Sequence, residues 1–378
     1  MRILFTLHDD ETPHAGGMGV ASGLATVYRA SGHDVRFLTF GDMSQRLPFR
    51  VKYLLFPEFS AWRLFSAAAD VIDASCGDAW LWARLRRPHK EGPRPLLVTR
   101  SHGLLHIADQ ARRAEATRGG IDLSWKYPLY WGGPRLREVA ASFRAADLCL
   151  FLNDYERDFA VGELGVTEER ARIVDNGLPG FLLGLPFDKE AQPPQQFSVV
   201  HVGSYLPLKG VRYAVAAIET LFERYPQTRA LFIGCGCSPD RVLGDFQPQN
   251  RARVRVEQNY RREQLADLLA DQSVVLSATL KEGFPLGILE AMACGLPAVT
   301  AATPGPLQYV EDEVNGLIAP AADSEGLAAA LERLIGEPSL HRRLRVAAYR
   351  TAQRYSWQRI GSETLTLYQQ ALGKRQRP

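Results

Sequence analysis

The chain has 378 residues, which is more than one hydrophobic core usually supports, and 46% of them are hydrophobic, so we expect two globular domains. Its formal net charge of +3 is small and its basic residues are spread along the chain, which argues against a nucleic-acid partner. Five irregularly spaced cysteines argue against a disulfide framework and for a reducing compartment, so the protein is expected to be cytoplasmic.

The amino-terminal segment agrees with this expectation. Residues 1–10 carry one arginine and a short apolar run that ends in acids, which is typical of a first β-strand and not of a signal peptide. No apolar run in the sequence reaches transmembrane length.

The first 190 residues predict a Rossmann-like α/β domain. A strand at 2–7, a loop at 8–19, a helix to about Ala30 and a strand at 35–40 make a βαβ unit. We assign the further apolar runs to the same parallel sheet, and both of its faces should be covered by helices. These runs lie at 53–56, 71–74, 96–99, 148–152 and 172–174.

A polar, proline-rich stretch at 188–196 predicts a linker to a second α/β domain, which we place at 191–356. Its strands are expected at 197–202, 230–234, 254–256, 274–277, 298–300 and 317–319, and its helices at 211–224, 263–269 and 288–294. A last helix should begin after Ser356 as N-cap and span 357 to about 372.

Two sites in the first domain carry candidate ligand-binding residues. Gly16 and Gly17, in a GGMG run between strand and helix, either present backbone N–H groups to an anion or form a tight turn. The acids at 9–11 beside them are interpreted as solvated loop residues, not as a metal site. His102 follows a strand at its carboxyl end, where ligands of open α/β sheets gather, although a lone histidine is more often structural.

The stretch at 281–300, KEGFPLGILEAMACGLPAVT, predicts a turn that becomes a helix near Leu286, and such a helix start suits a phosphate. Glu282 lies in the expected loop and Glu290 in the expected helix. Each ionised carboxylate accepts hydrogen bonds, which fits the cis-diol of a ribose and the hydroxyls of a sugar. The alternative is that one glutamate favours the helix dipole and the other is simply solvated.

This stretch resembles the donor-binding motif of the family 4 retaining glycosyltransferases, the glycosyl transferases group 1. The resemblance implies the GT-B fold, with two Rossmann-like α/β domains facing a central cleft, and a helix at 357–378 that packs back on the first domain. It also implies that a nucleotide sugar binds mainly to the second domain, with Glu290 on the ribose and Glu282 on the donor sugar. By the same resemblance the diphosphate is held by Lys209 and by the backbone of Gly283, Phe284, Pro285, Leu286 and Gly287.

The segment at 202–210, VGSYLPLKG, departs from the family's pattern. Relatives carry an arginine and a lysine there that grip the diphosphate, whereas this chain has Ser204 at the arginine position and keeps only Lys209. One of the two expected cations is therefore missing. The alternative for Lys209 is an ordinary surface lysine. The resemblance also places His102 on the donor sugar and the Gly16–Gly17 loop near the acceptor and the donor phosphate.

The expected function is therefore that of a retaining hexosyltransferase. It would move a sugar from a UDP- or GDP-linked donor, as substrate, to an acceptor hydroxyl in polysaccharide, glycolipid or glycoconjugate synthesis. No metal and no other cofactor is expected. Two alternatives stay open: a nucleotide-sugar-binding protein without turnover, suggested by Ser204, and a GT-B sugar-nucleotide epimerase.

The acceptor is expected to be a sugar or a lipid-linked sugar. Aromatic and cationic residues mix at Trp80, Trp82, 84–87 and 125–131. They predict either peripheral contact with the inner face of a membrane or simply packed aromatic side chains.

Overall fold

The computed structural model describes residues 1–9, 16–85, 94–188 and 196–375. The chain divides into two compact units: residues 1–109, 123–177 and 357–378 form the first, and residues 110–122 and 178–356 form the second. Each contains one six-stranded parallel sheet, so the predicted α/β class with two parallel sheets is confirmed. The predicted linker at 188–196 lies almost wholly outside the described residues.

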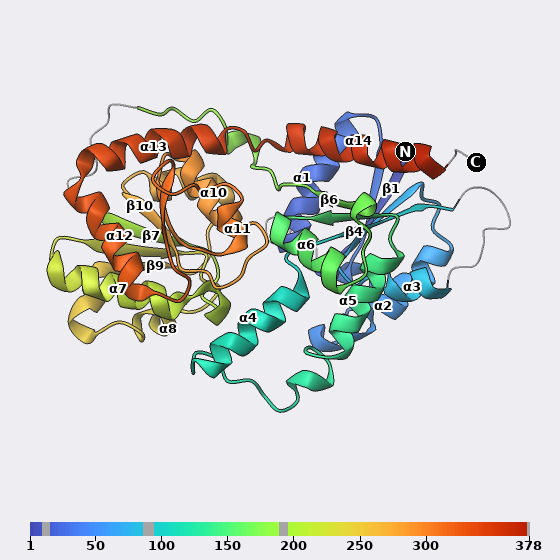
Figure 1. The fold of residues 1–378 in the computed structure, drawn as a ribbon, viewed down its shortest axis with the longest axis horizontal. Coiled ribbons are helices and arrows are strands. Elements are labelled where there is room, and N and C mark those ends of the chain that lie inside the picture. The colour runs from blue at the N-terminus through green and yellow to red at the C-terminus, as the bar shows by residue number, and fades with distance from the viewer. Residues whose placement is uncertain (10–15, 86–93, 189–195, 376–378) are drawn as a thin grey trace. The chain divides into compact units, whose positions relative to one another are not determined.

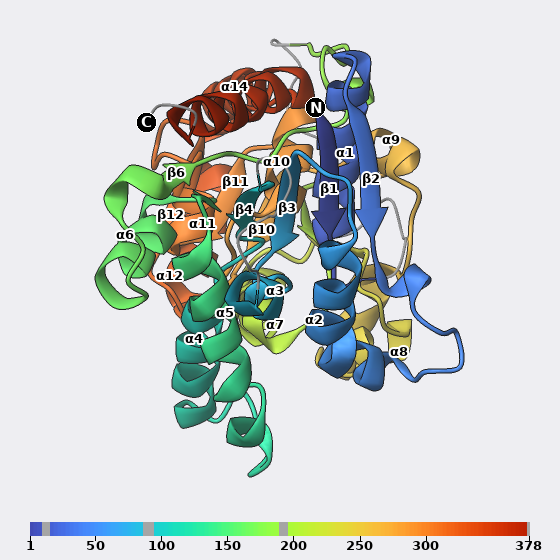
Figure 2. The same ribbon diagram turned by 90° about the vertical axis from the view of Figure 1, so that its right-hand side faces the viewer.

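The sheet of the first unit has the strand order β2-β1-β3-β4-β5-β6 (Figures 1 and 2). The order reverses between β1 and β3, and ligands of open α/β sheets bind outside the carboxyl ends of the strands at such a switch point. The strands are β1 (Arg2–Thr6), β2 (Asp34–Leu38), β3 (Val71–Ser75), β4 (Leu96–Arg100), β5 (Leu148–Phe151) and β6 (Ala171–Ile173). The helices are α1 (Gly16–Ala30), α2 (Phe49–Phe65), α3 (Trp80–Leu85), α4 (Leu105–Thr117), α5 (Pro134–Ala145), α6 (Asp154–Glu163) and α14 (Trp357–Arg375), and α4 continues into residues of the second unit.

The predicted strand at 53–56 is wrong, because this run lies inside helix α2. Lys52, Phe56, Ser60 and Leu64 are buried, and their spacing of four residues is the period of one helix face. A four-residue apolar run is too short to distinguish a buried strand from a buried helix turn, and only the flanking residues reveal the period.

The sheet of the second unit has the order β12-β11-β10-β7-β8-β9. Its switch point lies between β7 and β10, and because the crossovers from these strands run in opposite directions, α7 and α10 cover opposite faces. The strands are β7 (Ser198–Val202), β8 (Arg229–Ile233), β9 (Val254–Glu257), β10 (Val274–Ser277), β11 (Ala298–Ala301) and β12 (Gly316–Ala319). The helices are α7 (Val211–Arg224), α8 (Pro239–Leu243), α9 (Leu265–Leu269), α10 (Leu286–Ala293), α11 (Pro304–Leu307), α12 (Ser324–Gly336) and α13 (Pro338–Ala352).

The C-terminal helix α14 belongs to the first unit, where it runs beside α1 (Figure 1). Tyr368 of α14 donates a hydrogen bond to Asp73 of β3, and Arg100 of β4 donates to the Tyr368 hydroxyl over 3.1 Å. Arg100 also donates to Asp73 over 2.7 Å. Burial lowers the pKa of Arg100, but the Asp73 carboxylate reverses this effect and raises it above its ordinary value. This network buries a charged pair beneath the last helix.

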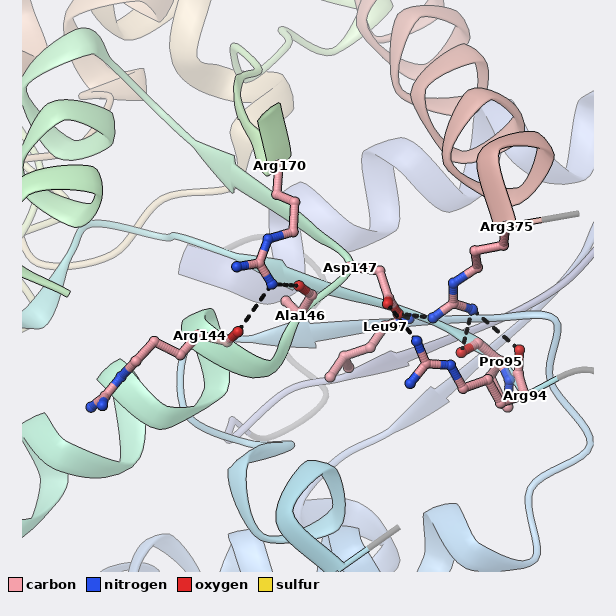
Figure 3. Close-up of polar contacts among 8 residues, drawn as sticks. All are labelled: Arg94, Pro95, Leu97, Arg144, Ala146, Asp147, Arg170 and Arg375. Atoms are coloured by element: carbon pink, nitrogen blue, oxygen red, sulfur yellow. Dashed lines mark hydrogen bonds and ion pairs between the residues drawn. The ribbon is translucent and has the colours of Figure 1, made fainter. Parts of the chain in front are cut away.

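The end of α14 makes a second set of contacts with the same unit (Figure 3). Arg375 pairs with Asp147 and donates to the carbonyl oxygens of Arg94 and Pro95 over 3.2 and 3.0 Å. Asp147 also accepts from the Leu97 amide over 2.9 Å, so its carboxylate joins the loop before β5 to the start of β4. These bonds fix the last turn of the helix on the sheet.

Candidate functional site

The loops at the switch point of the second unit bring Lys209 and Glu282 together. Lys209 ends a short 3₁₀ turn after β7, and Glu282 lies in the loop after β10. Gly210 follows the lysine with a φ of +67°, and a Cβ built on it would lie 1.8 Å from the carbonyl oxygen of Ala278. Only glycine allows the two loops to approach this closely.

Lys209 and Glu282 form an ion pair. Their side chains are 26% and 18% exposed, so a bound molecule can reach both. The Glu282 backbone is closely packed as well, because a Cβ on Gly305 would lie 2.5 Å from its carbonyl oxygen. The pair thus places one cation and one acceptor on a rigid base at the carboxyl edge of the sheet.

The segment from Gly283 to Gly287 leads from this loop into α10, which begins at Leu286, where the sequence predicted the turn to become a helix. Phe284 is buried against Tyr309, with ring centroids 5.0 Å apart, and the Tyr309 hydroxyl donates to the Pro285 carbonyl over 2.5 Å. The Phe284 side chain and the Pro285 backbone are therefore held in place by Tyr309. No side chain caps α10, so its first amide groups and its positive dipole end are offered to an anion.

Glu290 lies on the buried part of α10, and its side chain is only 4% exposed. Arg262, from the turn Arg262–Gln264 before α9, donates to its Oε1 over 2.6 Å. Burial raises the pKa of Glu290, and the Arg262 charge and hydrogen bond oppose that rise. The sequence did not single out Arg262, which stands in a polar run without a motif.

Glycines at the ends of β7 and β8 line the same edge. Gly203 has a φ of +132°, and a Cβ built on it would lie 3.9 Å from the Nζ of Lys209. Gly234 has a φ of +72°, and a Cβ there would lie 2.9 Å from the Tyr260 ring. Ser204, at the position of the family's arginine, is half-buried beside Gly203.

In the first unit, the structure brings the predicted residues Gly17 and His102 together. A Cβ on Gly17 would lie 3.4 Å from the His102 Nε2. Burial, and then the charges of Arg100 and His8, lower the pKa of His102 to about 3. The ring is therefore neutral at ordinary pH, with one nitrogen that donates and one that accepts. Gly16 and Gly17 form the first turn of α1 and not the predicted loop, because amides of a first turn need no intrahelical partner and tolerate glycine well.

Sequence reasoning missed a polar cluster beside these residues. His8 follows β1 and its Nδ1 lies 2.8 Å from Oδ1 of Asp78, which is fully buried after β3. Arg135 lies 3.6 Å from the same carboxylate and over the Tyr53 ring, 5.2 Å from its centroid. The positions of His8 and Asp78 at the carboxyl ends of switch-point strands are the signal that could have found them.

The aromatic residues that suggested a membrane contact differ in how far they are exposed. Trp82 is 3% exposed and packs in the core, which confirms for this residue the alternative of packed aromatic side chains. Trp131 packs on Tyr53, with ring centroids 4.6 Å apart, whereas Trp125 is 76% exposed. Arginines 86 and 87 lie outside the described residues. No helix among the described residues is both long and apolar enough to cross a membrane.

The described part of the chain contains no cluster of metal-binding residues. No group of three or more His, Cys, Asp or Glu residues there could hold an ion. Cys235 and Cys237, at the end of β8, are both free thiols.

Solved structures share this architecture along almost the whole chain. Sucrose-phosphate synthase from Thermosynechococcus elongatus has a TM-score of 0.80 at 20% identity and covers 99% of this chain and 100% of its own. The lipopolysaccharide glycosyltransferase WaaG has a TM-score of 0.72 at 18% identity, with 97% and 99% covered. HepE from Anabaena, solved with UDP and glucose, has a TM-score of 0.66 at 21% identity, with 97% and 99% covered. At these identities the likeness establishes the fold, which is the GT-B fold of glycosyltransferases.

Sequence comparison finds similarity over the second half of the chain. Residues 186–351, within the second unit, match the glycosyl transferases group 1. The D-inositol 3-phosphate glycosyltransferase of Saccharomonospora viridis is 30% identical over 218 residues, which cover 55% of this chain and 49% of that relative. The enzyme of the same name from Kribbella flavida is 31% identical over 243 residues, covering 60% and 57%. The chain spans about half the length of the first of these relatives. The match over residues 186–351 makes this part of the chain similar to the glycosyl transferases group 1, the family whose donor-binding motif the sequence resembles.

Proposed function

We propose that the protein is a retaining glycosyltransferase that moves a sugar from a nucleoside-diphosphate sugar to an acceptor hydroxyl. The observation that carries this proposal is the arrangement at the second switch point, where Lys209, Glu282 and the start of α10 meet at one edge of the sheet. Solved relatives of the same fold contain UDP, and one contains UDP-glucose, which supports a nucleotide-sugar donor.

The chemistry follows from the charge that develops during transfer. The bond to the anomeric carbon breaks with an oxocarbenium-like centre on one side and a diphosphate on the other, so preorganised positive charge stabilises the departing group. Lys209 and the first amides of α10 supply that charge. Glu282, released from Lys209 when the diphosphate binds, accepts hydrogen bonds from the donor sugar, and Glu290 accepts from the ribose hydroxyls.

The first unit is proposed to bind the acceptor, which is a sugar or a lipid-linked sugar. His102 is neutral and lies against Gly17, so it can donate a hydrogen bond to a sugar hydroxyl without adding charge.

The exposed Trp125 supports peripheral contact with a membrane. The free thiols of all five cysteines support a reducing, cytoplasmic location.

A screen of UDP- and GDP-linked sugars tests the proposed activity. We expect release of the nucleoside diphosphate, slowly to water and faster with an acceptor sugar. Binding of a nucleotide sugar without release of the diphosphate would favour the alternative of a binding protein without turnover. A changed sugar on an intact nucleotide would favour the alternative of an epimerase.

Replacing Glu290 by alanine should weaken binding of the nucleoside diphosphate by roughly 1.5–3 kcal/mol, the usual worth of hydrogen bonds to a charged group. Isothermal titration of the wild type and the variant measures this change. Glu257→Ala is the control, because that glutamate forms an exposed pair with Arg255 on β9. Equal affinity of wild type and Glu290→Ala would show that the ribose is held elsewhere.

Turnover should persist in excess EDTA, because Lys209 and the α10 amides provide the charge that a metal ion supplies in other transferases. The measurement is donor turnover before and after chelation. A loss of activity that Mg²⁺ or Mn²⁺ restores would contradict metal independence.

A further inference from the structure

Arg262 makes a contact that the proposed roles of the donor-site residues do not use. Its guanidinium and the carboxylate of Glu290 come from segments 28 residues apart, and their side chains are 15% and 4% exposed. The exposed pair of Arg255 and Glu257 differs, because those side chains are 67% and 34% exposed and are screened by water. The Arg262 contact is therefore a desolvated pair with fixed geometry.

This pairing leaves part of the carboxylate available. Arg262 donates to Oε1 of Glu290, and a carboxylate has about four lone-pair sites on its two oxygens. Oε2 has no hydrogen-bond partner among the described residues. An arginine on one oxygen fixes the plane of the group while the other oxygen can accept from a diol.

The pair also decides the charge of Glu290. Burial alone favours the protonated acid, which accepts hydrogen bonds poorly, and Arg262 opposes this by favouring the carboxylate. Among the described residues, the charge of Glu290 acts in turn on Tyr260, Tyr309 and Cys294, and raises the pKa of each. Burial raises the pKa of each of these three groups, so they are neutral at ordinary pH and Arg262 provides the compensating charge.

We propose that Arg262 is a positioning residue that holds Glu290 ionised and oriented, and thereby gives the donor site its preference for a ribonucleotide over a 2′-deoxyribonucleotide. The inference rests on the proposed function, in which Glu290 binds the ribose. Arg262 acts through Glu290, so its removal should erase recognition of the ribose hydroxyl more than it weakens binding of the phosphates.

The test compares UDP with 2′-deoxy-UDP, and GDP with 2′-deoxy-GDP, by isothermal titration. We expect the wild type to prefer the ribonucleotide by about tenfold or more, the usual effect of one hydrogen bond to a charged group. Arg262→Met should bring that preference to within about twofold, whereas Arg262→Lys should retain part of it because the charge is kept but the rigid fork is lost. Arg255→Met is the matched control and should leave the preference unchanged.

The pH profile gives a second readout that a purely structural arginine would not change. Binding of the ribonucleotide requires the carboxylate, so affinity should fall as the pH drops through the pKa of Glu290. Without Arg262 the pKa of Glu290 rises further, so the midpoint of this fall should move to higher pH. The deoxyribonucleotide should show a smaller dependence in both proteins.

The outcomes separate this inference from the function on which it rests. If Arg262→Met keeps both the preference and the wild-type pH midpoint, the positioning role is overturned while the transferase proposal stands. If the wild type binds the ribonucleotide and the 2′-deoxyribonucleotide equally, Glu290 does not recognise the ribose. The inference about Arg262 is then overturned as well. If neither UDP nor GDP binds the wild type, the proposed function itself is overturned. Should Arg262→Met fail to fold, an unchanged preference in Arg262→Lys overturns the inference.

Discussion

Replacement of Lys209 by alanine is expected to lower turnover of the donor by on the order of 10²–10³, the usual cost of removing one preorganised donor from a site where charge develops. Ser204 occupies the position of the family's arginine, so Lys209 is the remaining side-chain cation of this motif. Its ammonium already lies at the carboxyl edge of the sheet, paired with Glu282 and still partly exposed. The departing diphosphate therefore depends on it unusually strongly.

Arg212 lies three residues after Lys209, where a cation could compensate for the missing arginine, but its contacts engage it elsewhere. Its Nε lies 2.9 Å from the buried Glu115 carboxylate, and it donates to the Tyr213 hydroxyl over 2.7 Å. The guanidinium also covers the Tyr213 ring, 4.6 Å from the centroid. Leaving these contacts would take from the buried Glu115 its nearer cation and leave only Arg118, 3.7 Å away, so Arg212 does not replace the arginine of the motif.

Steady-state turnover and binding of the nucleoside diphosphate together check the Lys209 prediction. Lys209→Arg is the matched control and should retain most activity, because the positive charge stays. Ser204→Arg should tighten binding of the diphosphate and partly rescue Lys209→Ala, since a fork of donors suits phosphate oxygens. Near wild-type turnover in Lys209→Ala would show that other groups stabilise the departing diphosphate.

The sequence singled out residues of the proposed donor site but not how they come together. Glu282 was singled out by the stretch at 281–300 and Lys209 by the family resemblance, but their contact joins residues 73 positions apart. It depends on the sheet order, which makes β7 and β10 neighbours. Periodicity shows which residues form strands, whereas the order of strands in a sheet is decided by the packing of their crossovers.

Arg262 shows a different reason why sequence reasoning is incomplete. It stands in the run Tyr-Arg-Arg-Glu-Gln, where an exposed turn is the simplest interpretation. One of the two adjacent arginines, Arg261, is indeed exposed, while Arg262 turns toward Glu290. Nothing in the composition distinguishes the two, because the difference arises from the tertiary position of a buried carboxylate.

The second large effect is expected on the stability of the first unit, at the contact between helix α14 and the sheet. Replacing Asp73 by alanine should destabilise the first unit by about 3–5 kcal/mol, because Arg100 would be left as a buried charge without its partner. Hydrogen exchange of the β3 and α14 amides measures this locally in a protein with two units. We expect protection to fall by more than about 100-fold where exchange reports unfolding of this unit.

Two comparisons decide whether the uncompensated charge is the cause. Asp70→Ala removes a pair with Arg2 whose side chains are 39% and 54% exposed, and such surface pairs contribute about 0–1 kcal/mol, so protection should hardly change. The triple variant Asp73→Leu, Arg100→Met and Tyr368→Phe removes every member of the network and should recover most of the lost protection, since apolar replacement of a whole buried pair is often neutral. If the triple variant is as unprotected as Asp73→Ala, the uncompensated charge of Arg100 is not the cause of the loss. The buried polar group would then itself hold α14 on the sheet, and no apolar core of similar size could replace it.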